Sequence, residues 1–146
     1  MNHFNYEKLT ARHLPFFYDI RFSVCENILH PHQIQYLLHE QAIADINQGG
    51  GWICRSDNMY IGVAFGLFIP EPIIGGLFVK PEFQSRGIGT ILLDKVTDWL
   101  FTEGAETIKL TTDAGSKAEL FYIKNGWCVC GFDEFGQLEL SKRKKS

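Results

Sequence analysis

This sequence of 146 residues lacks several features, and each absence excludes a class of protein. No segment approaches the roughly 20 consecutive apolar residues that a membrane-spanning helix needs. The N-terminal residues, Met1 to Asn5, lack the basic and then apolar pattern of a signal peptide. The net charge is −3 and the isoelectric point is near 5.9, whereas nucleic-acid-binding domains usually present a basic face. We therefore expect a cytoplasmic protein with no membrane partner and no nucleic-acid partner.

Cysteine pairs with the spacing of metal ligands are also missing. Cys25 and Cys54 stand alone, whereas Cys128 and Cys130 are two positions apart in an expected strand and should share one face. Because there is no C-x-x-C pair, we expect neither a zinc site nor a redox site, and no other metal. The cysteines are expected to be small buried apolar side chains.

The glycine patterns typical of nucleotide-binding proteins are incomplete. Gly75 and Gly76 are not followed by the Gly-Lys-Ser/Thr of a P-loop, and Leu92 stands where a dinucleotide fingerprint needs its third glycine. The chain does have 45% hydrophobic residues, which is enough for a real core. Its length suits one domain, and we expect that domain to span residues 1–146.

The most informative stretch is Gln84-Ser85-Arg86-Gly87-Ile88-Gly89, between an apolar run (73–79) and an amphipathic run (88–101). This order predicts a strand, a tight turn and a helix of about 15 residues that stops at Gly104. The alternation in Thr107–Thr112 predicts a second strand, parallel to the first because such crossovers are right-handed. The free N–H groups at the helix start favour a phosphate or diphosphate. From these residues alone, a packing helix after a glycine turn is an equal alternative.

The rest of the chain predicts further helices and strands of a mixed sheet. Before the turn we expect a strand, two helices and two antiparallel strands: Tyr6–Thr10, His13–Ile28, Pro31–Asn47, Trp52–Arg55 and Met59–Ile69. After it we expect a helix that starts at a capping box of Ser116 and Glu119, then the strands Trp127–Gly131 and Gln137–Ser141. The basic tail, residues 142–145, is expected to be solvated and disordered. The predicted fold class is α/β, with a mostly antiparallel sheet around one parallel pair.

Three ordered motifs resemble those of the GNAT superfamily of acyl-CoA-dependent N-acyltransferases. The segment 84–89 resembles the Q/R-x-x-G-x-G/A signature, and Gly76–Glu82 resembles the strand and V-x-P sequence before it. Ala118–Trp127 resembles the A-x-x-F-Y-x-x-x-G-F segment that follows. The resemblance covers about residues 60–131. It implies the GNAT fold, in which the central parallel strands splay apart and helices cover both faces of the sheet.

The resemblance implies acetyl-CoA, or a related acyl-CoA, as the acyl donor. In the family the pantetheine arm pairs with the strand before the turn, like an added strand. The diphosphate would lie on main-chain N–H groups at the helix start, with Gln84 and Arg86 nearby; a solvated surface arginine is the alternative for Arg86. The cofactor-binding residues implied are Leu77, Phe78, Val79, Gln84, Ser85, Arg86, Gly87, Ile88, Gly89, Thr90 and Ser116.

The implied reaction is direct attack of a primary amine on the thioester in a ternary complex. Tyr122 matches the family's general acid for the leaving thiolate, and a phenol with a pKa near 10 is protonated at neutral pH. A core aromatic is the alternative for Tyr122. A backbone N–H of residues 77–79 is the candidate donor to the oxyanion. Many family members have an asparagine where this chain has Gly115, and Ser116 is the candidate for the lost polar contact.

The sequence assigns no general base. Ile73 occupies the position where some family members carry a glutamate, and Glu71 and Glu82 lie in loops, where carboxylates are usually solvated. His30 and His32 are candidates to reach the acceptor pocket, with ordinary surface histidines as the alternative. A water chain to solvent would also serve.

The acceptor is left open between a small amine, an amino-acid derivative, and a peptide N-terminus or lysine. Residues available to bind it are Phe16, Tyr18, Asp19, Glu26, Trp52 and Tyr60. The unassigned base and Gly115 make a non-catalytic acyl-CoA sensor or interaction module the alternative function. A glycine turn that binds nothing is a third reading. The sequence permits a homodimer as well as a monomer.

Overall fold

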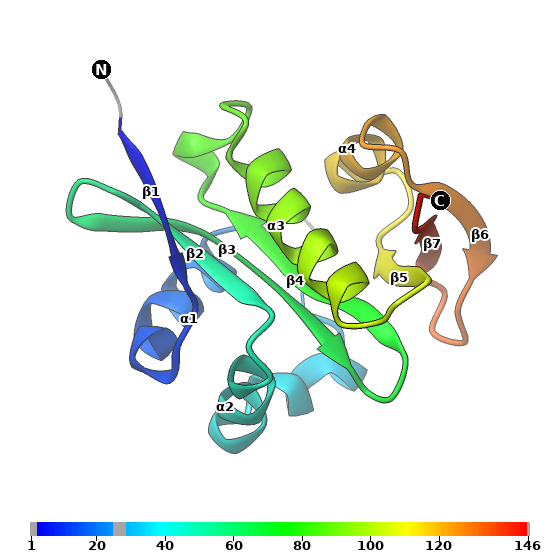
Figure 1. Ribbon diagram of the computed structural model, residues 1–146, viewed down its shortest axis with the longest axis horizontal. Helices are drawn as coiled ribbons and strands as arrows, with labels where there is room; N and C mark the ends of the chain where they lie inside the picture. The colour runs from blue at the N-terminus through cyan, green and yellow to red at the C-terminus, as the bar shows by residue number, and fades with distance from the viewer. Residues whose placement is uncertain (1–2, 25–28, 146) are drawn as a thin grey trace.

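The computed structural model describes residues 3–24 and 29–145. Within these residues, one seven-stranded sheet has the order β1-β2-β3-β4-β5-β7-β6 (Figure 1). Its strands are β1 Phe4–Lys8, β2 Gly51–Ser56, β3 Met59–Phe68, β4 Pro72–Val79, β5 Thr107–Thr112, β6 Cys128–Phe132 and β7 Leu138–Arg143. The helices are α1 Leu14–Ser23, α2 His39–Asn47, α3 Ile88–Thr102 and α4 Lys117–Lys124, with 3₁₀ turns η1 Ala11–His13, η2 Pro31–Leu37 and η3 Pro81–Phe83.

Helices cover both faces of the sheet, as expected. A side chain added at Gly66 of β3 would come within 2.9 Å of Leu100 and Val96, so this face of β3 lies directly against α3. Phe65, the neighbouring residue, points to the other face and meets Phe17 of α1 with ring centroids 5.7 Å apart. Two core clusters result, one under α3 and one under α1 and α2. The mixed α/β fold with one central parallel pair is confirmed.

Helix α3 forms almost where the sequence predicts it. Its buried face repeats at helical spacing through Ile88, Leu92, Val96 and Leu100, all at most 1% exposed. Gly104 follows the last turn with φ 116°, a left-handed conformation that glycine adopts without strain. Ile91 belongs to the same amphipathic run, but it is 43% exposed. The face of α3 that packs on the sheet is therefore narrower than the sequence predicts.

The first helix is shorter than the sequence predicts. Helix α1 ends at Ser23, whose hydroxyl donates to the Ile20 carbonyl at 2.6 Å. Such local bonds compete with the helical ladder. Val24 is already extended, with φ −82° and ψ 145°. Residues 25–28, including Cys25 and Glu26, lie outside the described residues.

The second predicted helix, Pro31–Asn47, is two separate elements. The 3₁₀ turn η2 stops at Leu37, Leu38 is extended with φ −63° and ψ 138°, and α2 starts at His39. The Tyr18 hydroxyl of α1 donates to the Leu37 carbonyl at 2.8 Å, which takes that carbonyl out of a continuous ladder. Ile34 and Leu38, apolar residues within the predicted helix, are 54% and 60% exposed.

Strands β4 and β5 part soon after they meet, and this parting positions the site. They pair in parallel only at Ile73 and Lys109. Beyond that point β4 pairs with β3 and β5 pairs with β7, so the facing edges diverge. A register shift in β4 leaves Gly75 as a bulge, where an added side chain would lie 2.4 Å from the Phe65 ring. Gly75 is therefore required by packing.

The C-terminal strands correct two expectations. Cys54 is buried as predicted, but Cys128 and Cys130 are exposed because β6 is the edge strand of the sheet. The basic tail, expected to be disordered, continues strand β7 through Arg143. The Lys142 amine donates to the Asn125 carbonyl at 3.1 Å, which ties the tail to the end of α4. Across the described ranges, no helix has both the length and the apolar character needed to span a bilayer.

Candidate active site

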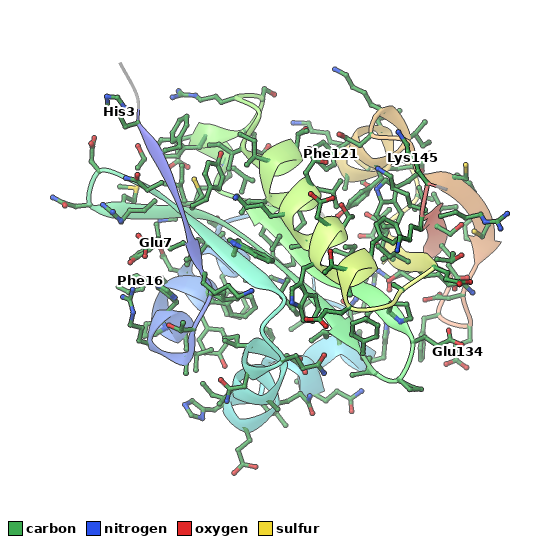
Figure 2. The ribbon with its side chains drawn as sticks, viewed as in Figure 1. His3, Glu7, Phe16, Phe121, Glu134 and Lys145 are labelled. Carbon is green, nitrogen blue, oxygen red and sulfur yellow. The ribbon has the colours of Figure 1, made fainter. Side chains whose placement is uncertain are left out.

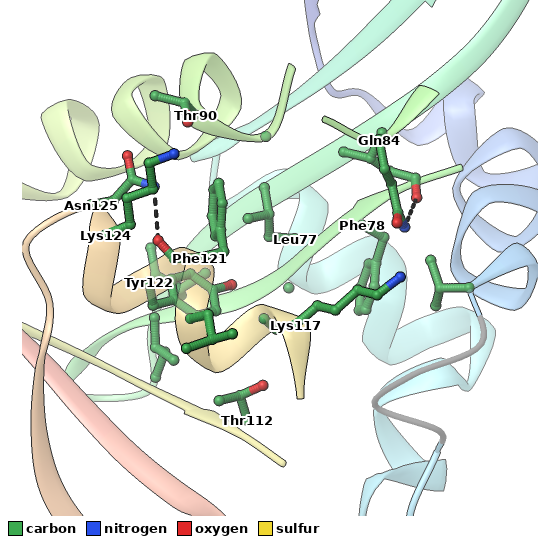
Figure 3. Close-up of a pocket in the computed structure, with 18 of the residues that line it drawn as sticks. Leu77, Phe78, Gln84, Thr90, Thr112, Lys117, Phe121, Tyr122, Lys124 and Asn125 are labelled. Carbon is green, nitrogen blue, oxygen red and sulfur yellow. Dashed lines mark hydrogen bonds between the residues drawn. The ribbon is translucent and has the colours of Figure 1, made fainter. Parts of the chain in front are cut away.

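A cleft of about 960 Å³ occupies the space where β4 and β5 diverge (Figure 3). One side of it is formed by the main chain of β4 and the turn into α3, and the opposite side by α4 and the end of β5. Arg21, Val24 and Gln33 come from the α1–η2 region on the other face of the sheet. The cleft therefore extends from the α3 face to the α1 face, and two ligands can approach from different directions.

The start of α3 offers unpaired main-chain donors at one end of this cleft. Gly87 precedes the helix in a left-handed conformation, φ 83° and ψ −1°, and no side chain caps the helix. The first bond of the ladder is donated by the Ile91 N–H to the Gly87 carbonyl, at 3.2 Å. The N–H groups of residues 88–90 come before it and have no partner within the helix. Together with the helix dipole, they form a binding place for an anion.

The second glycine of the motif permits close packing. An added side chain at Gly89 would meet the Phe121 ring at 3.3 Å, and Figure 2 shows Phe121 near α3 and α4. At Gly87 an added side chain would meet nothing within 4 Å, so only its backbone conformation demands glycine. The two glycines are therefore needed for different reasons. Gly87 allows the backbone conformation of the turn, and Gly89 lets α4 approach the start of α3.

Two predicted cofactor contacts have other partners in this structure. The Gln84 side chain donates to the Val79 carbonyl at 3.0 Å, which closes the turn onto the end of β4. The Arg86 guanidinium lies 5.3 Å from the centre of the Phe83 ring and is exposed. Gln84, Ser85, Gly87, Gly89 and Thr90 line the cleft, whereas Arg86 and Ile88 do not.

Ser116 caps a helix and does not line the cleft. Its hydroxyl donates to the Asp113 carbonyl at 2.7 Å and accepts from the Glu119 N–H at 3.2 Å. The Glu119 carboxylate accepts from the Gly115 N–H at 2.8 Å, one residue earlier than the predicted capping box requires. Gly115 has φ 79°, so this turn uses its glycine to bring that N–H to the carboxylate.

Tyr122 lies on α4 and lines the cleft, although only 6% of it is exposed. Its ring packs edge-to-face against Phe121 and Trp127, with centroids 5.3 and 5.8 Å away. Burial raises the pKa of its hydroxyl above the ordinary value of 10.0, because the charged phenolate would lose its solvation. Tyr122 therefore carries its proton at neutral pH, so it can act there as an acid and not as a base.

The β4 residues alternate across the opening. Leu77 and Val79 pack toward the α3 core, whereas Phe78 packs toward the α1 core. Arg21 of α1 lies over the Phe78 ring at 4.4 Å and is only 8% exposed. Burial lowers the pKa of Arg21 from its ordinary value, yet arginine stays charged at neutral pH. This cation on the α1 side of the cleft is not among the residues that the sequence singled out.

Sequence reasoning also missed two lysines of α4. Lys117 and Lys124 both line the cleft, and Figure 3 shows Lys117 reaching across it toward Phe78. They are four residues before and three residues after Phe121, so all three share one helix face. That spacing is the signal that would have found them once Phe121 was placed at the cleft.

The residues expected to bind an acceptor lie mostly elsewhere, since none of the described ones lines the cleft. Asp19 forms an ion pair with Lys80 at 2.6 Å, and Tyr60 donates to a carboxylate oxygen of Glu7 at 3.3 Å. Phe16 packs on Tyr60 with ring centroids 4.6 Å apart. The positions on the α1 side that do line the cleft are Arg21, Val24 and Gln33.

Solved structures with similar folds include acetyltransferases. PaiA N-acetyltransferase from Thermoplasma acidophilum, in complex with coenzyme A, aligns with a TM-score of 0.79 at 19% identity, over 97% of this chain and 99% of that one. The ribosomal-protein-S18-alanine N-acetyltransferase from Escherichia coli aligns with a TM-score of 0.71 at 17% identity, over 97% and 94%. N-acetylglutamate synthase from Neisseria gonorrhoeae, complexed with coenzyme A and N-acetyl-glutamate, aligns with a TM-score of 0.76 at 16% identity, over 99% and 36%. At these identities the likeness shows the fold.

The sequence itself matches a family model. A comparison with curated proteins finds no match. The model of the Acetyltransferase (GNAT) family matches residues 14–127, which include the parted strands, the glycine turn and the helix that carries Tyr122. The chain therefore belongs to the GNAT acetyltransferase family.

Proposed function

We propose that this protein is an N-acetyltransferase that moves the acetyl group of acetyl-CoA to a primary amine in a ternary complex. The observation that carries the proposal is the opening between β4 and β5, which leads to the uncapped start of α3. An extended arm fits beside the free edge of β4, residues 77–79, and a diphosphate fits the N–H groups at the helix start. The open space at Gly87 admits such an anion close to the main chain.

Charge in the cleft supports the same ligand. Its described lining includes the cations Lys117, Lys124 and Arg21 but no aspartate or glutamate. A polyanion such as coenzyme A is therefore attracted, although the whole chain carries a net charge of −3. We infer that Gln84 acts by holding the turn in shape, since its amide is bonded to the Val79 carbonyl.

The reaction needs three things from the chain. Acetyl-CoA supplies an activated acyl carbon: the amine nitrogen bonds to it, the carbon–sulfur bond breaks, and an amide and a free thiol result. An acceptor that starts as an ammonium loses two protons, one before it attacks and one afterwards, and the sulfur gains one. A backbone N–H of residues 77–79 serves the developing oxyanion, and Tyr122 donates to the leaving sulfur.

The two openings of the cleft suit a ternary complex. The helix start lies on the α3 face, whereas Arg21 and Gln33 come from the α1 side. A donor held from the first side leaves the second side for the acceptor, so both are present together and no acyl-enzyme is needed. We infer that one domain performs the whole reaction, with the acceptor an amine on a small molecule, an amino acid or a peptide.

Tyr122→Phe tests the proposal. The change removes one hydroxyl and keeps the ring contacts with Phe121 and Trp127, so stability should stay close to that of the wild type. We expect kcat to fall by about 10²–10⁴-fold, with the dissociation constant of acetyl-CoA unchanged in calorimetry. Tyr60→Phe is the matched control, because its hydroxyl bonds Glu7 away from the cleft. Equal turnover of the two variants would remove Tyr122 from the mechanism.

A non-catalytic acyl-CoA-binding module is the second candidate. It is favoured by the absence of aspartate, glutamate and histidine among the described residues that line the cleft, which leaves no obvious proton acceptor there. Release of thiol from acetyl-CoA across a panel of amines distinguishes the two functions. Tight binding without any amine-dependent release would support the second candidate.

A further inference from the structure

An ammonium acceptor must lose a proton before its nitrogen can attack, and the described lining of the cleft contains no carboxylate or imidazole for this purpose. Glutamines stand in the lining instead: besides Gln84 of the turn, these are Gln33 from η2 and Gln137 just before β7. Glutamine side chains do not accept protons at neutral pH. Gln33 and Gln137, however, are each hydrogen-bonded to a titratable residue, Gln33 to the main chain of His30 and Gln137 to the side chain of Asp113.

These two titratable residues, His30 and Asp113, also contact each other. The His30 Nε2 atom lies 2.9 Å from Asp113 Oδ1, although the residues are 83 positions apart. Their side chains are 35% and 30% exposed, so the contact is open to water and still partly sheltered. His30 comes from the connection between α1 and η2, on the acceptor side, and Asp113 follows the end of β5.

The glutamines hold the pair against the cleft. Gln33 Oε1 accepts from the His30 main-chain N–H at 3.0 Å, and Gln137 Nε2 lies 3.3 Å from Asp113 Oδ1. The glutamines also face each other, with Gln33 Nε2 and Gln137 Oε1 3.4 Å apart. The His30 main chain and the Asp113 carboxylate are therefore each held by a glutamine that lines the cleft.

We propose that His30 takes the proton of the acceptor ammonium, through a bridging water, and that Asp113 is the positioning residue that orients its imidazole. This inference rests on the proposed acetyltransfer. Imidazole suits the role because this kind of side chain can accept a proton near neutral pH, and the Asp113 carboxylate orients the ring through Nε2. The ammonium becomes the neutral amine, His30 becomes the cation, and its exposed edge returns the proton to solvent.

The surroundings distinguish His30 from its neighbour. His32, the second titratable group near the ring, stacks face-to-face on Phe135 of the β6–β7 hairpin with centroids 3.8 Å apart. The rings of His30 and His32 are 5.7 Å apart. Among the described residues, the charged or titratable groups in contact with His30 are thus Asp113 from the end of β5 and His32 from η2, and of these two histidines only His30 has a described carboxylate within hydrogen-bond distance.

The test compares His30→Gln, Asp113→Asn and the control His32→Gln in steady-state kinetics with an amine substrate at several pH values. For His30→Gln we expect kcat/KM for the amine to fall about 10²-fold near neutral pH, with an unchanged KM for acetyl-CoA. The deficit should shrink as pH approaches the amine's own pKa, near 10 for an alkylamine, because solvent then removes the proton. Asp113→Asn should show a smaller deficit with the same pH trend, and His32→Gln should behave as wild type.

Thermal unfolding of all three variants identifies any that fail to fold. If His30→Gln is one of them, the pH dependence of kcat/KM for Asp113→Asn still tests the proposal. Equal kcat/KM for His30→Gln and His32→Gln at every pH, with an active wild type, would overturn this inference alone. A deficit that stays constant with pH would also overturn it, since it would indicate a purely structural role. A wild type that binds acetyl-CoA but acetylates no amine would overturn the proposed function and this inference together.

Discussion

Replacing Gly87 with glutamate tests the anion site at the start of α3 more directly than any other change in the lining. The residue has φ 83°, and a side chain added there meets nothing within 4 Å. The folding cost is therefore conformational, about 1–2 kcal/mol for a residue forced into the left-handed region. A negative charge at a helix start regains about 0.3–1 kcal/mol. The net loss of unfolding free energy should be about 1 kcal/mol, so the variant remains folded.

Ligand binding should respond far more strongly than stability. A carboxylate about 4 Å from a phosphate charge costs about 1 kcal/mol in water and about 4 kcal/mol at an effective dielectric constant of 20. The dissociation constant of coenzyme A should therefore rise by between about 5-fold and about 10³-fold. Gly87→Asn is the matched control, because asparagine tolerates the left-handed region and adds no charge.

Titration calorimetry with coenzyme A at low ionic strength gives the comparison. Repetition in high salt should narrow the difference between the two variants, because salt screens the repulsion at this exposed position. If Gly87→Glu and Gly87→Asn bind coenzyme A equally well, the diphosphate does not lie at the helix start. The functional proposal would then lose its main support.

Three further changes test other parts of the structure. Gly66→Ala would place a methyl group 2.9 Å from Leu100, and this overpacking should lower the unfolding free energy in urea by about 1–3 kcal/mol; wild-type stability would contradict the tight β3–α3 contact. Ser116→Ala should cost about 0.5–2 kcal/mol of stability through the lost helix cap and leave coenzyme A affinity unchanged, whereas weaker binding would place Ser116 at the ligand. Burial lowers the pKa of His13 below its ordinary value of 6.5, and its Nδ1 accepts from the Thr10 N–H at 3.0 Å. The folded state thus favours the neutral form, so its stabilising contribution is complete above that ordinary value and is lost as the pH falls from there through the lower pKa of the folded state; urea midpoints of wild type and His13→Leu should diverge in pH dependence in that range, and parallel curves would contradict this.

Local signals predicted the centre of the fold well. The helix expected over 88–101 is observed as Ile88–Thr102, and the strand Thr107–Thr112 has the predicted bounds. Both follow from residues close in sequence: an apolar repeat, a glycine before the helix and another after it. The parting of β4 and β5 came only from the family resemblance, because no single strand reveals where its partner leaves it.

What the sequence could not show depends on distant partners. The break at Leu38 follows a hydrogen bond from Tyr18 to Leu37, 19 residues away. The exposure of Cys128 and Cys130 follows from the strand order, in which β7 lies between β5 and β6. In the site, the helix start and Tyr122 were named beforehand, but the pairing of His30 with Asp113 joins residues 83 positions apart.

The single rung between Ile73 and Lys109 has a mechanical consequence. It divides the sheet into two halves, one of four strands that ends at β4 and one of three strands that begins at β5, and the two halves are paired at this one point. A small rotation of one half about this point would widen or narrow the cleft and leave the hydrogen bonds of the other strand pairs intact. Side chains under α3 still connect the two halves of the sheet, since the core cluster there includes both Leu92 of α3 and Leu140 of β7. A ligand bound in the cleft between β4 and β5 would contact both halves of the sheet and hold them in one relative orientation.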